Sequence, residues 1–159
     1  MATRILWLED DKLPAIEVGL SDAGYIVDRA YFLAEGDEYL KKNIYGLVLM
    51  DVLMAVDPED IAIGYNAKET NKGNKAGLAF YKRHCKTIAD MSAAVIVYSV
   101  VSDEDEIREG FKGLGVPESN ILYKVSESSV SDLLGHIKRD LRTRSDVSQS
   151  AQNRNRGVQ

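Results

Sequence analysis

Short, uninterrupted runs of apolar residues recur along most of the chain, separated by longer stretches of mixed polarity. An apolar run that does not alternate with polar residues is typical of a strand buried on both faces, as in a parallel sheet covered by helices. These runs predict five strands, at residues 5–8, 25–27, 47–50, 94–98 and 121–123.

Apolar positions with helical spacing follow each of these runs. Positions that recur every three to four residues share one face of a helix, and here they predict helices at residues 13–23, 33–43, 78–88, 102–114 and 130–141. We expect Ser102 to cap the fourth helix, because acidic residues that favour the helix dipole follow it directly. The alternation of strand and helix predicts an α/β fold of (βα)5 type, with an open, doubly wound parallel sheet.

Two stretches do not fit this alternation. Residues 55–75 are long for a connection between a strand and a helix and contain many polar residues, which predicts a functional or mobile loop. The charges of Asp57, Glu59 and Asp60 in this loop could reach a bound metal ion or face solvent, and we expect them to face solvent. Residues 142–159 are polar and predict a disordered tail. We therefore expect one domain over residues 1–141, with the long loop inserted into it.

Composition narrows the class of protein further. Of the 159 residues, 45% are apolar and 28% charged, as in an ordinary globular domain, and the net charge of -5 gives no indication of nucleic-acid binding. Cys85 is the single cysteine, which excludes an internal disulfide. His84 and His136 have no acidic or cysteine partner at ligand spacing and are expected on the surface or in packing roles. No apolar run approaches the roughly 18 residues of a membrane span, so we expect a cytoplasmic protein that binds neither nucleic acid nor a membrane.

Ionisable and hydroxyl side chains stand where four of the predicted strands end. Parallel strands bring their carboxyl ends to one edge of the sheet, and this edge is where doubly wound folds bind their ligands. The residues concerned are Glu9, Asp10 and Asp11 after the first strand, Asp51 after the third, Ser99 at the end of the fourth and Lys124 after the fifth.

The acidic residues of this group favour a site for a divalent cation. If Asp10, Asp51 and one of Glu9 or Asp11 lie about 5 Å apart, each pair repels by roughly 3 kcal/mol at an effective dielectric constant of about 20. Such a cluster requires a cation. Carboxylate oxygens without imidazole or thiolate suit Mg²⁺.

The remaining residues favour a phosphoryl group beside that cation. Lys124 would supply a fixed positive charge, Ser99 a hydrogen-bond donor and Asp51 a nucleophile that attacks phosphorus. Taken singly, an acid after a first strand often only caps the next helix, as Asp11 would, and an acid at a strand end is often a turn residue. The joint placement of these residues on four strands favours the functional interpretation.

Four segments, in the same order, resemble the motifs of response-regulator receiver domains, and the resemblance covers residues 3–141. The segment ILWLEDD is similar to the family's first strand and acidic pair, and YGLVLMDVLM to its phosphoacceptor strand. AAVIVYSV is similar to the strand that ends in Ser or Thr, and ILYK to the strand that ends in lysine. The resemblance implies a flavodoxin-like fold with strand order 2-1-3-4-5, Asp51 as phosphoacceptor assisted by Ser99 and Lys124, and Mg²⁺ held by Glu9, Asp10, Asp51 and the backbone carbonyl of Leu53.

The same resemblance implies a function. A histidine kinase or histidine phosphotransfer protein would donate the phosphoryl group to a stand-alone response regulator, which is no enzyme apart from catalysing its own phosphorylation and dephosphorylation. A downstream target protein would bind the face formed by the fourth helix, the fifth strand and the last helix, or residues 55–75. Leu53 and Val101 match two positions that flank the attacking water. Both are apolar, which predicts a phosphoaspartate that persists for hours.

Departures from the family pattern leave an alternative open. Ala55 and Val125 stand where the family has prolines, and Ile121 stands where it has an aromatic residue. We expect the bond between Lys124 and Val125 to be trans, because a cis bond before valine costs about 3 kcal/mol. The alternative is a pseudo-receiver that binds proteins without phosphorylation. A phosphohydrolase of the haloacid dehalogenase type would need an acid in place of Leu53, and a flavin carrier would need a phosphate-binding loop after the first strand.

Overall fold

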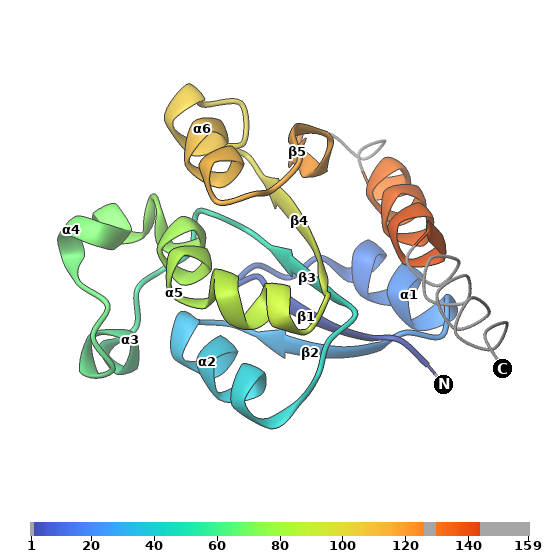
Figure 1. Ribbon diagram of the computed structural model, residues 1–159, viewed down its shortest axis with the longest axis horizontal. Helices are drawn as coiled ribbons and strands as arrows, with labels where there is room; N and C mark the ends of the chain where they lie inside the picture. Colours follow the sequence, from blue (N-terminus) through green and yellow to red (C-terminus); the bar gives the residue numbers. More distant parts are fainter. Residues whose placement is uncertain (1, 126–129, 144–159) are drawn as a thin grey trace, which may run out of the picture.

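In the computed structural model, which describes residues 2–125 and 130–143, five parallel strands form one sheet with helices on both faces (Figure 1). The strand order is β2-β1-β3-β4-β5, which confirms the predicted order. The strands are β1 (Arg4–Leu8), β2 (Ile26–Ala30), β3 (Leu47–Met50), β4 (Ala94–Ser99) and β5 (Ile121–Tyr123).

Two layers of helices cover the sheet, because its three central strands are apolar on both sides. Along β1, Trp7 contributes to one hydrophobic core, while Leu6 and Leu8 contribute to the core on the opposite face. The layer over Trp7 contains α1 and the helix at residues 130–143, and the opposite layer contains α2, α5 and α6 (Figure 1). The bounds are α1 (Pro14–Asp22), α2 (Leu33–Lys42), α5 (Ala76–Asp90) and α6 (Asp105–Gly113).

The second strand lies further along the chain than predicted. The apolar run at residues 25–27 indicated a strand there, but β2 begins at Ile26 and continues through Asp28 and Arg29. Because β2 is an edge strand and is partly exposed along most of its length, it tolerates charged residues that an apolar run does not mark. The predicted bounds of β3 and β5 are confirmed.

The prediction that Ser102 caps the fourth helix is wrong. The N-cap residue of α6 is Glu104. Before α6 the chain forms turns, in which the amide of Ser102 donates to the carbonyl of Ser99 at 3.4 Å and the amide of Glu104 donates to the carbonyl of Val101 at 3.1 Å. These turns place Ser102 in the interior, where it is fully buried, before the helix starts.

The last helix covers residues 130–143, so Arg142 and Thr143 are helical. The rest of the predicted tail, residues 144–159, lies outside the described residues. Within residues 2–125 and 130–143, no helix combines the length and the apolar character that crossing a membrane requires.

Residues 55–75 contain three short helices that the sequence analysis did not predict, and they extend away from the sheet beside α5 (Figure 1). The polar residues of this insertion form the ends of these helices. The side chain of Asp57 accepts the amide of Glu59 at 2.9 Å, and that of Asn66 accepts the amide of Glu69 at 2.7 Å. Short helices between polar caps resemble loop sequence, because the capping residues Asp and Asn are also common in turns. The helices are α3 (Pro58–Ala62), α4 (Ala67–Thr70) and the 3-10 helix η1 (Asn71–Gly73).

Asp60 contradicts the expectation that the charges of the insertion face solvent. Its carboxylate is fully buried. One oxygen accepts the amide of Ala34 in the first turn of α2 at 2.7 Å, and the other accepts the amide of Asp57 at 2.9 Å. A single carboxylate therefore satisfies amides at the start of two helices and joins the insertion to the body of the domain.

We expect Asp60→Ala to lower the free energy of unfolding by about 2–6 kcal/mol, because two amides lose a buried partner at about 1–3 kcal/mol each. Urea unfolding followed by circular dichroism measures this loss. Glu59→Ala, on the same helix but exposed, is the matched control and should change the free energy of unfolding by less than about 0.5 kcal/mol. Equal effects of the two substitutions would contradict the structural role of Asp60.

A second polar contact joins the insertion to α2 and α5. The hydroxyl of Tyr65 donates to Asp37 at 2.9 Å, and the guanidinium carbon of Arg83 lies 3.6 Å from the centroid of the Tyr65 ring. Nε2 of His84 lies 2.5 Å from Asp37. His84 therefore has an acidic partner 47 positions away in the sequence, and its ring also packs against Phe80 at 4.6 Å between centroids, in line with the expected packing role. His136 also has polar partners, Asn120 at 2.9 Å and an acid one helical turn away at 3.8 Å.

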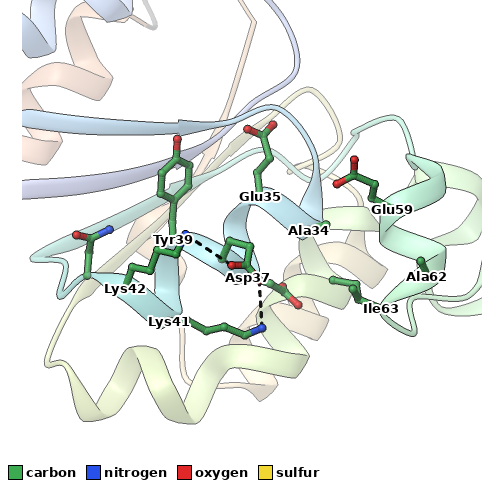
Figure 2. Close-up of a pocket in the computed structure, with 11 residues that line it drawn as sticks. Ala34, Glu35, Asp37, Tyr39, Lys41, Lys42, Glu59, Ala62 and Ile63 are labelled. Carbon is green, nitrogen blue, oxygen red and sulfur yellow. Dashed lines mark hydrogen bonds and ion pairs between the residues drawn. The ribbon is translucent and has the colours of Figure 1, made fainter.

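A groove of about 570 Å³ lies between α2 and α3. Figure 2 shows Glu59, Ala62 and Ile63 of the insertion on one side of this groove and the side chains of α2, among them Lys41 and Lys42, on the other. The insertion therefore forms an additional surface of the domain beside α2.

Candidate functional site

Three carboxylates meet at the carboxyl edge of the sheet, as predicted. In the parallel register of β1 with β3, Leu8 lies opposite Met50, so the residues that follow them are neighbours. Glu9, Asp10 and Asp51 each offer an oxygen, and these oxygens all lie within 4.8 Å of one another. Glu9 and Asp51 are buried, whereas Asp10 is more exposed, so the cluster has an open side.

The position of Asp51 is fixed by hydrogen bonds to the backbone. Its amide donates to the carbonyl of Leu8 at 2.9 Å, which extends the pairing of β3 with β1 beyond the strand end. Oδ1 of Asp51 accepts the amides of Val52 at 2.7 Å and Leu53 at 3.2 Å. Oδ2 lies 3.2 Å from the ammonium group of Lys124. One oxygen therefore orients the carboxylate and the other faces a cation.

Lys124 joins two of the three carboxylates. Its Nζ donates to Glu9 at 2.7 Å and to Asp51 at 3.2 Å, and its amide donates to the carbonyl of Ser99 at 3.1 Å. Burial lowers the pKa of Lys124, but the charge of Asp51 and the hydrogen bond and charge of Glu9 outweigh burial and raise that pKa above its ordinary value. The side chain is therefore a permanent cation. The described residues contain no cis peptide bond, so the bond from Lys124 to Val125 is trans, as expected.

Burial and the repulsion between the carboxylates of the site change the pKa of Glu9. Burial and the neighbouring charge of Asp51 raise the pKa of Glu9 to about 7, although the hydrogen bond and charge of Lys124 act in the opposite direction. With all three carboxylates ionised, three negative charges and one ammonium leave two negative charges. A divalent cation matches this difference, and the oxygen-only donor set with one open side suits Mg²⁺, which keeps several of its waters.

Ser99 contributes a buried hydroxyl beside these charges. It ends β4 and is fully buried, and its Oγ has no hydrogen-bond partner among the residues that the structure describes. A buried hydroxyl without a partner costs free energy unless a ligand satisfies it. Ser102, which the sequence analysis assigned to a helix cap, has the same property.

Asp11 lies outside the cluster. Its amide donates to the carboxylate of Glu9 at 3.1 Å, and this contact helps to orient Glu9. Asp11 is not the cap of the following helix either, because the N-cap residue of α1 is Leu13, without a side-chain hydrogen bond. The insertion contributes the amide of Ala55, which donates to Asp10 at 2.9 Å. Asp57, Glu59 and Asp60 of the insertion are not members of the cluster.

Gly77 allows the closest approach to the site and was missed in the sequence analysis. Its amide donates to the carbonyl of Val52 at 3.0 Å. A Cβ atom built on Gly77 would lie 2.0 Å from the carbonyl oxygen of Asp51. The start of α5 therefore packs directly on the backbone that carries Asp51. The glycine after Ala76 was the available signal, since a glycine in the first turn of an apolar helix often marks such an approach.

We expect Gly77→Ala to lower the free energy of unfolding by about 1–3 kcal/mol, because the added Cβ meets backbone atoms that cannot move aside independently. Gly113→Ala is the matched control, since a Cβ at Gly113 meets nothing within 4 Å. Chemical unfolding of both variants measures the difference. Full stability of Gly77→Ala would contradict the close packing of α5 on the acceptor strand.

Exposed apolar residues follow Asp51, Ser99 and Lys124 closely in the sequence. Leu53 is 39% exposed, Val100 47% and Val125 61%. Ile121, at the position where an aromatic residue was expected from the resemblance, is buried in the core. The carbonyl of Leu53 as a metal ligand stays a prediction.

Comparison with known proteins identifies the fold. No protein-family model matches the chain. A CheY-like response-regulator receiver domain of Methanospirillum hungatei superposes with a TM-score of 0.68 and 19% identity, covering 92% of this chain and 98% of that one. The chemotaxis response regulator CheY4 of Vibrio cholerae gives a TM-score of 0.61 at 18% identity, covering 88% of this chain and 99% of that one. At these identities the similarity shows the fold alone.

A curated protein, present in two strains, resembles part of the chain in sequence. The transcriptional regulatory protein DltR of Streptococcus agalactiae is 42% identical over 53 residues, which are 32% of this chain and 24% of that protein. The chain thus matches about a quarter of the length of this regulator. The similarity is local and says nothing of the remaining three quarters.

Proposed function

We propose that this chain, which has the fold of response-regulator receiver domains, is a response regulator that accepts a phosphoryl group on Asp51. The observation that carries the proposal is the contact of Lys124 Nζ with both Glu9 at 2.7 Å and Asp51 at 3.2 Å, within a carboxylate cluster. A turn residue or a helix cap would not need this combination of buried charges.

In the proposed reaction a carboxylate oxygen of Asp51 attacks the phosphorus of a phosphohistidine on a histidine kinase or phosphotransfer protein. The oxygen–phosphorus bond forms while the phosphorus–nitrogen bond breaks, and the imidazole of the donor keeps the electron pair. The amides of Val52 and Leu53 fix the orientation of the carboxylate. Lys124 neutralises the transferred oxygens, and Ser99 donates its free hydroxyl hydrogen bond to one of them.

Glu9, Asp10 and Asp51 are the residues that would hold Mg²⁺, together with the backbone carbonyl of Leu53. When bound, the ion supplies positive charge that offsets the repulsion between the carboxylates and the incoming phosphoryl oxygens. Binding also keeps Glu9 ionised, because a cation beside a carboxylate lowers its pKa.

The alternative of a pseudo-receiver is less well supported. Val125, in place of the family's proline, was one of the departures that favoured it. With a trans bond before Val125, Lys124 still reaches both carboxylates. We therefore assign the chain to phosphoacceptor signalling rather than to constitutive binding or to enzymatic turnover of a substrate.

A downstream target protein is proposed to bind one of two surfaces. The first comprises α6, β5 and the helix at residues 130–143. The second is the insertion, where Ile61 is 63% exposed and Ile63, which lines the groove of Figure 2, is 44% exposed. Exposed isoleucines on a short, well-anchored element are suited to binding a protein.

We expect the phosphoaspartate to persist for hours. Leu53 and Val101 flank the position of the attacking water in the family pattern, and neither side chain has a hydrogen-bonding group that would orient water or accept its proton. The decay of the phosphorylated mass in the purified protein measures the lifetime. Leu53→Asn should shorten it, and loss of the phosphoryl group within a minute in the unaltered protein would contradict this expectation.

The proposed function is tested by intact mass spectrometry after incubation with a small-molecule phosphodonor, and in parallel with a phosphorylated histidine phosphotransfer protein. We expect a gain of one phosphoryl group that requires Mg²⁺ and is lost in EDTA. No gain from either donor, together with no Mg²⁺ binding by calorimetry, would contradict the proposal and leave the pseudo-receiver.

A further inference from the structure

The side chain of Arg29, on the edge strand β2, reaches across to the end of β1. Its Nε donates to the carbonyl oxygen of Glu9 at 2.9 Å, and its Nη2 donates to the carbonyl oxygen of Asp11. These two carbonyls belong to the residues on either side of Asp10. A single guanidinium therefore holds the backbone of the acidic segment at both sides of Asp10.

The guanidinium is itself fixed in place. Arg29 lies opposite Trp7 in the register of β2 with β1, and its guanidinium carbon is 3.9 Å from the centroid of the Trp7 ring. Its Nη1 forms an ion pair with Glu17 of α1 at 2.7 Å, and only 11% of the side chain is exposed. Stacking and the ion pair together hold the planar group of donors in one orientation.

This arrangement determines where two of the carboxylates point. Asp10 is fixed through its backbone by Arg29, and its side chain accepts the amide of Ala55 at 2.9 Å. Glu9 is fixed through its carbonyl by Arg29 and through its carboxylate by the amide of Asp11 at 3.1 Å. Movement of the Asp11 backbone would therefore change the direction of both side chains.

We infer that Arg29 is a positioning residue for the proposed Mg²⁺ site, and this inference rests on the proposed function. Arg29 acts through the backbone rather than through its charge, because Glu17 neutralises that charge at 2.7 Å. Groups that orient metal ligands without touching the metal typically change metal affinity by about 10- to 100-fold. An arginine that only stabilised the edge of the sheet would change stability and leave the affinity for Mg²⁺ unaltered.

Lysine cannot replace arginine in this role. Two carbonyls separated by one residue accept from two different nitrogen atoms of the same rigid plane, Nε and Nη2. A lysine ammonium is a single nitrogen on a flexible chain and does not hold both carbonyls in one geometry. The effect of Arg29→Lys on Mg²⁺ binding therefore separates geometry from charge.

The test is isothermal titration of Mg²⁺ into the unphosphorylated full chain, at a temperature where near-ultraviolet circular dichroism shows every variant folded. We expect the dissociation constant to rise about 10- to 100-fold in Arg29→Met and to rise at least severalfold in Arg29→Lys. Arg4→Met is the matched control, since Arg4 is also an arginine that pairs with an acid, at 3.6 Å, but it is the first residue of β1 and lies at the end of the strand opposite to Glu9. Its dissociation constant should equal that of the unaltered chain.

The outcomes distinguish this inference from the proposed function. Absence of Mg²⁺ binding in the unaltered chain would overturn both. Equal affinities in the unaltered chain, Arg29→Lys and Arg29→Met would overturn the inference alone, whatever the change in stability. If Arg29→Met does not fold, Arg29→Lys decides the question by itself, because unchanged affinity in that variant means that the rigid donor group is not required.

Discussion

Asp51→Asn is expected to abolish phosphorylation completely. An amide oxygen is a poor nucleophile, and the substituted side chain loses the negative charge that pairs with Lys124 at 3.2 Å. The variant should fold normally, because an asparagine oxygen still accepts the amides of Val52 and Leu53. Intact mass after incubation with a phosphodonor and Mg²⁺ measures the result.

The stability of Asp51→Asn provides a second observation. The charge of Asp51 is one of the causes that raise the pKa of Glu9 to about 7. Removing it should lower the pKa of Glu9 and leave the metal-free protein at least as stable as the unaltered chain. Asp11→Asn is the matched control, because Asp11 is adjacent in sequence to the cluster but contributes no carboxylate to it. Phosphorylation should persist in that control, and phosphorylation of Asp51→Asn would place the acceptor elsewhere.

Lys124→Met is expected to give the largest loss of stability at the site. Removing one partner of a buried ion pair typically costs about 3–5 kcal/mol, because the remaining charge stays buried without compensation. Here two carboxylates, Glu9 and Asp51, lose the same cation. Urea unfolding in EDTA measures the loss, and phosphorylation should fall together with it.

The pH dependence of this loss follows from Glu9. The pKa of Glu9 in the folded chain is about 7, against an ordinary value of 4.5, so its contribution favours folding at low pH and disappears as the pH rises between these values. Lys124 lowers the pKa of Glu9, and its removal should raise that pKa further. Lys124→Met should therefore be least destabilised near pH 5 and most destabilised near pH 8.

The stability of Lys124→Met in Mg²⁺ shows whether its loss of stability comes from uncompensated charges or from lost packing. If the cost of Lys124→Met comes from uncompensated carboxylates, Mg²⁺ should restore more stability to this variant than to the unaltered chain at pH 8. Lys112→Met is the matched control, because Lys112 is a lysine of α6 that pairs with the acids Glu109 and Glu118 at 3.4 and 3.8 Å at the surface. A loss that is independent of both pH and Mg²⁺ would contradict the account.

The sheet and the acidic site were predictable because short-range patterns encode them. Buried parallel strands are apolar throughout, so the runs that became β3 and β5 had the correct bounds. The carboxyl ends of such strands share one edge, so the sequence alone predicts Asp51 beside Glu9 and Lys124, where the structure has it. Where the apolar run is weak, as in the edge strand β2 with its Asp28 and Arg29, the observed bounds of the strand differ from the predicted ones.

The structure of the insertion was not predictable for a physical reason. Its attachment depends on single long-range partners, such as Asp60 with the amide of Ala34 and Tyr65 with Asp37. Nothing in the local sequence distinguishes a buried capping carboxylate from a charge on a solvated loop. The close approach of Gly77 to Asp51 is also a long-range contact. A glycine in the sequence indicates that another group packs closely against the backbone, but it does not identify that group.

Two backbone amides connect the insertion to the acidic cluster and to the segment that follows Asp51. Ala55 donates to Asp10 at 2.9 Å, and the amide of Met54 donates to the carbonyl of Gly73 at 3.1 Å. The insertion therefore begins and ends on the segment that carries Asp51. This continuity makes it suited to transmit a change at the acceptor to a bound protein.

The central claim is that Asp51 is the acceptor, and chemical localisation of the phosphoryl group tests it most directly. Borohydride reduces an aspartyl phosphate to homoserine, which peptide mass spectrometry locates in the sequence. After phosphorylation and reduction, we predict homoserine at position 51 and unmodified Glu9, Asp10 and Asp11. Modification at one of those acids instead, or none at any acid after a confirmed gain of a phosphoryl group, would contradict the account.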